Sequence, residues 1–234
     1  MKVAVLNNSG NVGKTTVARH LLAPRMGNCP ILFVETINEG GDASQFKGRD
    51  FRQVLIELAL LDSAVVDIGS SNIESVFAQL HRLHDAHEDF DFYVVPTVSS
   101  QKQQRDTVNT LNALLEIGVE TSRIKLVFNM VEPGDKVADV FPDLVAVAKA
   151  NGMSTEAVIH SNEVYPLIGT RDLAENVVNI AALKELAAKA TDQDEKRKLA
   201  TAVSIARLAT GAKAELDSVF QAMFPAVVPA AVSA

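Results

Sequence analysis

The residues with the clearest chemistry lie near the amino terminus, in the stretch NNSGNVGKTT. Gly10 and Gly13 allow the backbone to curl so that successive N–H groups face one point. Lys14 adds a positive charge at that point, and the hydroxyl of Thr15 is a suitable ligand for Mg²⁺ beside a phosphate. These residue types at this spacing predict a loop that binds the phosphates of a nucleotide.

The standard form of this motif is G-x-x-x-x-G-K-[ST], and only its second half is matched. Asn8 stands where the first glycine is expected. The flanking sequence supports the motif, because an apolar run at 3–6 precedes the loop and a helical pattern at 15–22 follows it. The dipole of such a helix adds to the attraction for an anion. An accidental match in a glycine-containing turn is the alternative.

Three acidic residues at or after the ends of apolar runs could serve phosphate chemistry. Asp67 ends the run SAVVD and is expected to hold the water shell of Mg²⁺. Glu35 ends the run ILFVE, at the kind of strand end where α/β ligand sites form, and could orient the attacking water or ligate a metal. Asp42 follows in a glycine-rich stretch and is a second candidate for orienting water. Each could instead be a structural residue of a turn.

Asn129 ends the apolar run of RIKLVFN. An asparagine at a strand end can pair with the edge of an adenine base through its side-chain amide. A turn residue without a ligand is the alternative interpretation.

Short apolar runs and helical patterns alternate along most of the chain. The runs do not alternate with polar residues, as is typical of strands buried on both faces of a parallel sheet. The expected strands are 3–6, 31–34, 64–68, 92–95, 124–128 and 157–159. The expected helices are 15–22, 51–61, 73–87, 102–116, 139–151 and 172–190. This order predicts an α/β fold with a doubly wound, mostly parallel sheet.

Composition narrows the class of protein. The net charge of −7 gives no whole-chain signature of nucleic-acid binding, so contact with DNA would need a local patch or a partner. The single cysteine, Cys29, cannot form a disulfide within the chain. The first residues are too short and polar a run for a signal peptide, and no stretch of about 18 apolar residues is present. We therefore expect a cytoplasmic protein.

Together these residues resemble the deviant Walker A ATPases of the ParA/MinD class, whose loop reads K-G-G-x-G-K-[ST]-T. In that class the glycine missing at Asn8 is not required, and the resemblance covers about residues 1–190. It implies ATP and Mg²⁺ as cofactors, with Thr15 and Asp67 at the metal. It implies Lys14, Glu35 and Asp42 as catalytic residues. The implied nucleotide-binding residues are Ser9, Gly10, Asn11, Val12, Gly13, Lys14, Thr15, Thr16 and Asn129.

Two residues depart from the pattern of that class. Ser9 stands where the class has a lysine that reaches the phosphates of a partner subunit across an ATP-sandwiched dimer. Lys47 and Arg49 could substitute for it, or could lie in a solvated loop. Glu35 stands where the class usually has an aspartate, which lowers the expected rate of ATP hydrolysis.

The stretches NNSGNVGKTTVARHLLAPRM and FVETIN further resemble StbB plasmid stability proteins. This implies a slowly hydrolysing ATP-dependent switch in plasmid stability, DNA positioning or conjugative transfer. The implied assembly is a nucleotide-dependent homodimer with a small DNA-binding partner, which makes contact with plasmid DNA indirect. We expect no membrane attachment, although the C-terminal helical pattern leaves a membrane-surface role open. Two further functions stay open: a nucleotide-binding adaptor without turnover, and a small-molecule P-loop kinase or ligase.

The expected organisation has three parts. Residues 1–190 form a P-loop ATPase domain, 191–224 a helical extension and 225–234 a flexible tail rich in proline and alanine.

Overall fold

The computed structural model describes residues 1–35, 45–47, 50–169 and 171–225. Within these residues, seven strands form one sheet in the order β3-β2-β4-β1-β5-β6-β7, and every pair of neighbours is parallel. The strands are β1 (Lys2–Val5), β2 (Ile31–Val34), β3 (Gln45–Phe46), β4 (Ala64–Ile68), β5 (Phe92–Thr97), β6 (Ile124–Val131) and β7 (Val158–His160). The predicted fold class is confirmed, and each predicted strand coincides with an observed one.

The chain divides into two compact units. The first contains Met1–His160 and the chain from Val219 onward, and the second contains Ser161–Ser218. The main helices of the first unit are α1 (Lys14–Thr16), α2 (Ala23–Arg25), α3 (Phe51–Ala59), α4 (Ile73–Arg82), α5 (Gln101–Glu116), α6 (Val137–Val140) and α7 (Pro142–Ala150). The second unit holds α8 (Val164–Ile168), α9 (Ile180–Lys189) and most of α10 (Gln193–Met223). The expected domain boundaries at 190 and 224 stay a prediction.

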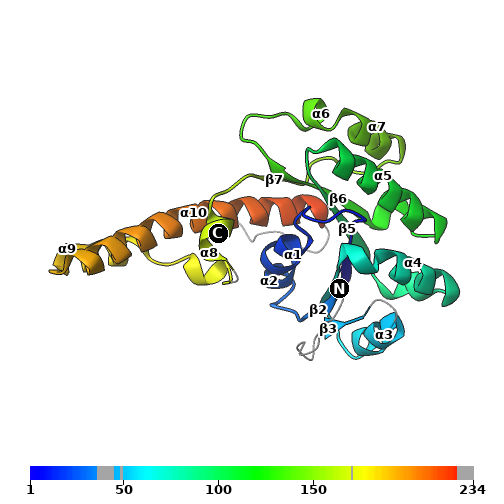
Figure 1. Ribbon diagram of the computed structural model, residues 1–234, viewed down its shortest axis with the longest axis horizontal. Coiled ribbons are helices and arrows are strands. Elements are labelled where there is room, and N and C mark those ends of the chain that lie inside the picture. Colours follow the sequence, from blue (N-terminus) through cyan, green and yellow to red (C-terminus); the bar gives the residue numbers. More distant parts are fainter. Residues whose placement is uncertain (36–44, 48–49, 170, 226–234) are drawn as a thin grey trace. The chain divides into compact units, whose positions relative to one another are not determined.

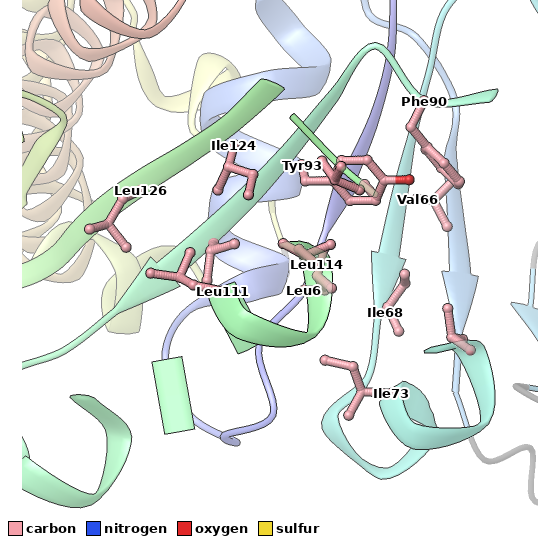
Figure 2. Packing of buried hydrophobic residues seen from close by; sticks show 14 of the residues in the cluster. Leu6, Val66, Ile68, Ile73, Phe90, Tyr93, Leu111, Leu114, Ile124 and Leu126 are labelled. Carbon is pink, nitrogen blue, oxygen red and sulfur yellow. The ribbon is translucent and has the colours of Figure 1, made fainter. Parts of the chain in front are cut away.

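Helices cover both faces of the sheet in the first unit (Figure 1). On one face, α3, α4, α5 and α7 pack on side chains such as Leu6, Val66 and Leu126. Figure 2 shows Leu111 and Leu114 of α5 directed into this cluster with Tyr93 and Phe90. On the other face, the segment from α1 to α2 buries Val17, Ala18, Leu21 and Leu22. Burial of apolar surface on both faces explains why these strands are continuously apolar.

Two expected helices are shorter or broken. The helix expected over 73–87 ends early, at Arg82, because Leu83 is extended at φ −92° and ψ 108°. A left-handed Asp85, at φ 56°, then precedes a 3₁₀ turn. The helix expected over 139–151 is divided into α6 and α7. Phe141 leaves helical geometry at φ −126° and ψ 49°, because the proline ring of Pro142 disfavours helical geometry in the residue before it.

The predicted boundaries in the second half of the chain also differ from the observed ones. The helix expected over 172–190 begins at α9, where the Asn179 side chain accepts a hydrogen bond of 3.1 Å from the N–H of Ala182. The helical extension expected after residue 190 is present as α10, which begins at Gln193 and ends at Met223. Among the described residues, no helix combines the length and apolar composition needed to cross a membrane.

Candidate functional site

The loop between β1 and α1 has the backbone that its glycines allow. Gly13 has φ 84° and ψ 26°, a left-handed geometry that side chains disfavour. A Cβ on Gly13 would lie only 2.1 Å from Nδ2 of Asn129, so this position requires glycine on two grounds. Asn11 also has a positive φ, 58°, and is exposed, whereas Val12 is fully buried. The loop thus combines left-handed geometry at Asn11 and Gly13 with a buried side chain at Val12.

Lys14 lies within the loop. Its Nζ donates hydrogen bonds to the carbonyl oxygens of Ser9 at 2.7 Å and Asn7 at 3.2 Å. Burial lowers the pKa of this ammonium, and the nearby Asp67 opposes that shift. A buried ammonium whose hydrogen bonds go to two carbonyl oxygens is suited to an anionic ligand, because phosphate charge would offset its desolvation.

Thr15 and Asp67 lie on different elements, and their side chains are hydrogen-bonded to each other. Thr15 Oγ1, on α1, donates to Asp67 Oδ2 at the end of β4, with 2.7 Å between the two oxygens. Asp67 is 3% exposed, and burial raises its pKa while the hydrogen bond from Thr15 and the charge of Lys14 oppose the shift. One hydroxyl and one carboxylate oxygen fit Mg²⁺, which prefers hard oxygen ligands and keeps several waters. No cluster of three or more His, Cys, Asp or Glu side chains suited to a metal occurs among the described residues.

The first half of the loop is bonded to α5 and the end of β5. Asn7 is fully buried, and its Nδ2 donates to Pro96 O at 2.9 Å and Thr107 Oγ1 at 2.8 Å. The N–H of Asn8 donates to Thr110 Oγ1 at 3.0 Å. Sequence reasoning missed these threonines. The available signal was the two threonines at i and i+3 on an otherwise amphipathic helix, where they share one face.

Ser9 has a side chain that is buried within the chain. It is 3% exposed, its N–H donates to Asn7 Oδ1 at 2.8 Å, and its hydroxyl is hydrogen-bonded to the Asp106 carboxylate. Asp106 in turn accepts a hydrogen bond of 2.9 Å from Lys102. Ser9 therefore lies in the loop, as the motif predicts, but presents no group to the surface.

Glu35 lies just after β2, beside Asp67. Its side chain is exposed, and its charge contributes to the raised pKa of Asp67. Its Cγ lies 3.7 Å from the place a Cβ on Gly69 would occupy. Asp42 and Arg49 fall outside the described residues, while Lys47 is half-buried after β3.

The remaining predicted residues lie around the same loop. Asn129, in β6, donates through Nδ2 to Val12 O at 3.0 Å and is 3% exposed. Gly10 is exposed opposite Ser70 Oγ, and Thr16 is half-buried in α1. The structure thus brings every predicted site residue that it describes to the carboxyl edge of the sheet, where the parallel strands end.

No protein-family model matches the sequence, and no curated protein matches it. Among solved structures, the MinD cell division protein of Aquifex aeolicus superposes with a TM-score of 0.50 at 9% identity, covering 97% of this chain and 98% of that one. The MinC:MinD cell division protein complex of the same organism gives 0.54 at 9% identity, covering 98% and 97%. The ATP complex of a McdA variant from Cyanothece gives 0.48 at 12% identity, covering 99% and 98%. The chain therefore has the fold of MinD, over nearly its whole length.

Proposed function

We propose that this chain is an ATP-binding molecular switch of the ParA/MinD type that hydrolyses ATP slowly. The observation that carries the proposal is the 2.7 Å hydrogen bond between Thr15 Oγ1 and Asp67 Oδ2. It places a hydroxyl and a carboxylate together beside a lysine buried in the glycine-containing loop. This combination serves a magnesium-bound phosphate chain better than it serves an unliganded turn.

Each residue has a separate role in the proposed site. Lys14 would exchange its two carbonyl partners for phosphate oxygens, which favours its charged form. Thr15 and Asp67 would hold Mg²⁺, which when bound neutralises phosphate charge. Glu35 or Asp42 would orient the attacking water. Glu35 is exposed beside Asp67, on the metal side of the loop.

The adenine preference is assigned to Asn129. Because its Nδ2 is bonded to Val12 O, its Oδ1 is the atom that would accept a hydrogen bond from the exocyclic amino group of adenine. Guanine offers an acceptor at that position and would not pair. The site is thus proposed to favour ATP over GTP.

The proposed biological setting follows from the resemblance to StbB plasmid stability proteins. We assign the chain to plasmid stability, DNA positioning or conjugative transfer in the cytoplasm. It would act as a nucleotide-dependent homodimer, and a small DNA-binding protein would contact the plasmid DNA. The net charge of −7 supports an indirect contact with DNA.

A second candidate, a nucleotide-binding adaptor without turnover, is favoured by one observation. Ser9 is 3% exposed and bonded to Asp106 within its own subunit. A short hydroxyl held in this way brings no positive charge to the phosphates of a neighbouring subunit. Binding without efficient hydrolysis is consistent with that geometry.

ATP hydrolysis and light-scattering mass, each measured with and without Mg-ATP, separate the candidates. The switch predicts slow phosphate release and an ATP-dependent rise in mass, both lost in Lys14→Ala and retained in the exposed-lysine control Lys149→Ala. The adaptor predicts ATP binding with no phosphate release. If Ser9→Lys changes neither property, the missing lysine does not limit the activity. A wild-type chain that neither binds nor responds to ATP contradicts both candidates.

A further inference from the structure

Met130 combines a strained backbone with an exposed apolar side chain. It has φ 55° inside β6, where the pairing with β7 shifts register between Phe128 and Val131. Its side chain is 47% exposed, while its neighbours Asn129 and Val131 are 3% and 1% exposed. A bulge of this kind re-aims one side chain, and left-handed geometry at a bulky residue indicates a constraint imposed by the surroundings.

The residues on either side of Met130 fix the bulge. Asn129 is tied to the phosphate loop by its hydrogen bond to Val12 O, and Val131 belongs to the hydrophobic core. The chain between them must turn Met130 outward at the carboxyl edge. Strain that is held in place beside a binding loop points to function.

Met130 lies against the phosphate loop, on the side away from the proposed metal. Its Cε is 3.8 Å from the place a Cβ on Gly13 would occupy. In the sheet, β1 lies between β4, which carries Asp67, and β5, which is followed by β6. A nucleotide whose terminal phosphate and metal lie near Asp67 therefore extends its ribose and base toward β6.

We propose that Met130 is the platform on which the nucleobase lies, an inference that rests on the proposed nucleotide site. A thioether is polarisable and makes favourable contacts with aromatic rings. It contacts the ring and forms no hydrogen bond to the base edge. Met130 thus contributes affinity for adenine and guanine nucleotides alike, and leaves the choice between them to Asn129.

Calorimetric titrations with Mg-ATP, Mg-GTP and Mg-tripolyphosphate test the assignment, because tripolyphosphate has no base. Met130→Ala is expected to weaken ATP and GTP about 10-fold each and to leave tripolyphosphate unchanged. Met130→Leu retains most of the affinity. Leu60→Ala, which truncates an apolar side chain that is 76% exposed on the unrelated surface after α3, changes none of the three.

A glycine substitution separates this role from a structural one. Met130→Gly removes the backbone strain, so its thermal unfolding temperature should equal or exceed that of the wild type while ATP binding weakens as in Met130→Ala. The proposed platform is wrong if Met130→Ala leaves the ATP affinity unchanged, or if it weakens tripolyphosphate binding as much as ATP binding. A wild-type chain that binds neither ATP nor tripolyphosphate overturns the proposed function itself.

Oxidation of Met130 supplies a second readout. Mass spectrometry after brief treatment with hydrogen peroxide should show Mg-ATP slowing sulfoxide formation at Met130, whereas Mg-tripolyphosphate does not. Equal oxidation with and without saturating Mg-ATP would contradict the contact with the base.

Discussion

The two edges of the sheet in the first unit are built from different kinds of residue. At the carboxyl edge, buried polar side chains gather around the phosphate loop: Asn7, Ser9, Lys14, Asp67, Thr97, Thr107, Thr110 and Asn129. At the amino edge, Phe92 begins β5 and packs against Phe224, with ring centroids 4.9 Å apart, and Phe220 packs on Phe224 at the same distance. One edge is stabilised by apolar packing, and the other retains polar groups whose burial is costly.

One charged residue near the amino edge, Lys125, is bonded in a different way. Lys125 Nζ donates to Ser122 O at 2.9 Å and lies 5.1 Å from the centroid of the Phe92 ring. Burial disfavours the charged form of all three side chains, but Lys14 and Asp67 are more deeply buried than Lys125. We therefore expect substitutions at the carboxyl edge to change binding, and substitutions at the amino edge to change stability.

The largest expected effect is that of Gly13→Ala. The added methyl group would meet Asn129 Nδ2 at 2.1 Å and force a side chain into φ 84°, so Mg-ATP affinity should fall about 1,000-fold in calorimetry. Gly27→Ala is the matched control, because Gly27 also has a positive φ, 76°, but nothing lies within 4 Å of its added Cβ. If both variants lose the same amount of affinity, backbone strain at a positive φ explains the effect, and the contact with Asn129 does not.

Phe224→Ala tests the amino edge. Phe224 is 2% exposed, and removing its ring should lower the free energy of unfolding by about 3 kcal/mol, measured by urea denaturation. The Kd for Mg-ATP should stay the same, provided that it is measured well below the unfolding transition. A large change in that Kd would contradict the division between the two edges.

Asp67→Asn should show how much stability the protein loses by burying a carboxylate at the carboxyl edge. Burial raises the Asp67 pKa above its ordinary value, so the folded protein retains this proton more tightly than the unfolded chain. Stability of the ligand-free wild type should therefore fall as the pH rises from the ordinary value of 3.8 through the raised pKa. The Asn side chain removes this pH dependence and should raise the free energy of unfolding by about 1 kcal/mol at neutral pH. The magnesium dependence of ATP binding should be lost in this variant. A destabilised variant would contradict this reasoning.

The smallest effect is expected at the rim of the carboxyl edge. The hydrogen bond from Lys102 lowers the pKa of Asp106, so the stability that the pair supplies is present at neutral pH and is lost as the pH falls through the lowered pKa. Because both side chains are partly or largely exposed, Asp106→Asn should cost about 0.5 kcal/mol or less in denaturation experiments. If Asp106→Asn lowers the ATP affinity as much as Gly13→Ala does, Asp106 belongs to the binding site.

The sequence predicted those features that depend on local pattern. The apolar runs locate the strands because burial on both faces removes polar alternation, as at 64–68 and 124–128. The loop residues could be predicted because glycine, lysine and threonine have few other reasons to occur at this spacing after a strand. Asp67 followed from its place at the end of such a run.

Features that depend on tertiary contact could not be predicted in this way. The two-residue strand β3 has no periodicity of its own, and its pairing with β2 defines it. The burial of Ser9 depends on α5, which lies about 100 residues later in the chain. The outward turn of Met130 depends on the simultaneous anchoring of its two neighbours.

Binding of Mg-ATP to the full chain, measured by titration calorimetry, decides whether the loop is a nucleotide site. The wild type and the exposed-lysine control Lys149→Ala should each bind one Mg-ATP per chain with the same Kd. Lys14→Ala should bind at least about 100-fold more weakly, because the phosphates lose their buried ammonium, and its unfolding should stay cooperative. A wild type that shows no binding, or a Lys14→Ala variant that binds like the wild type, would contradict the proposed site.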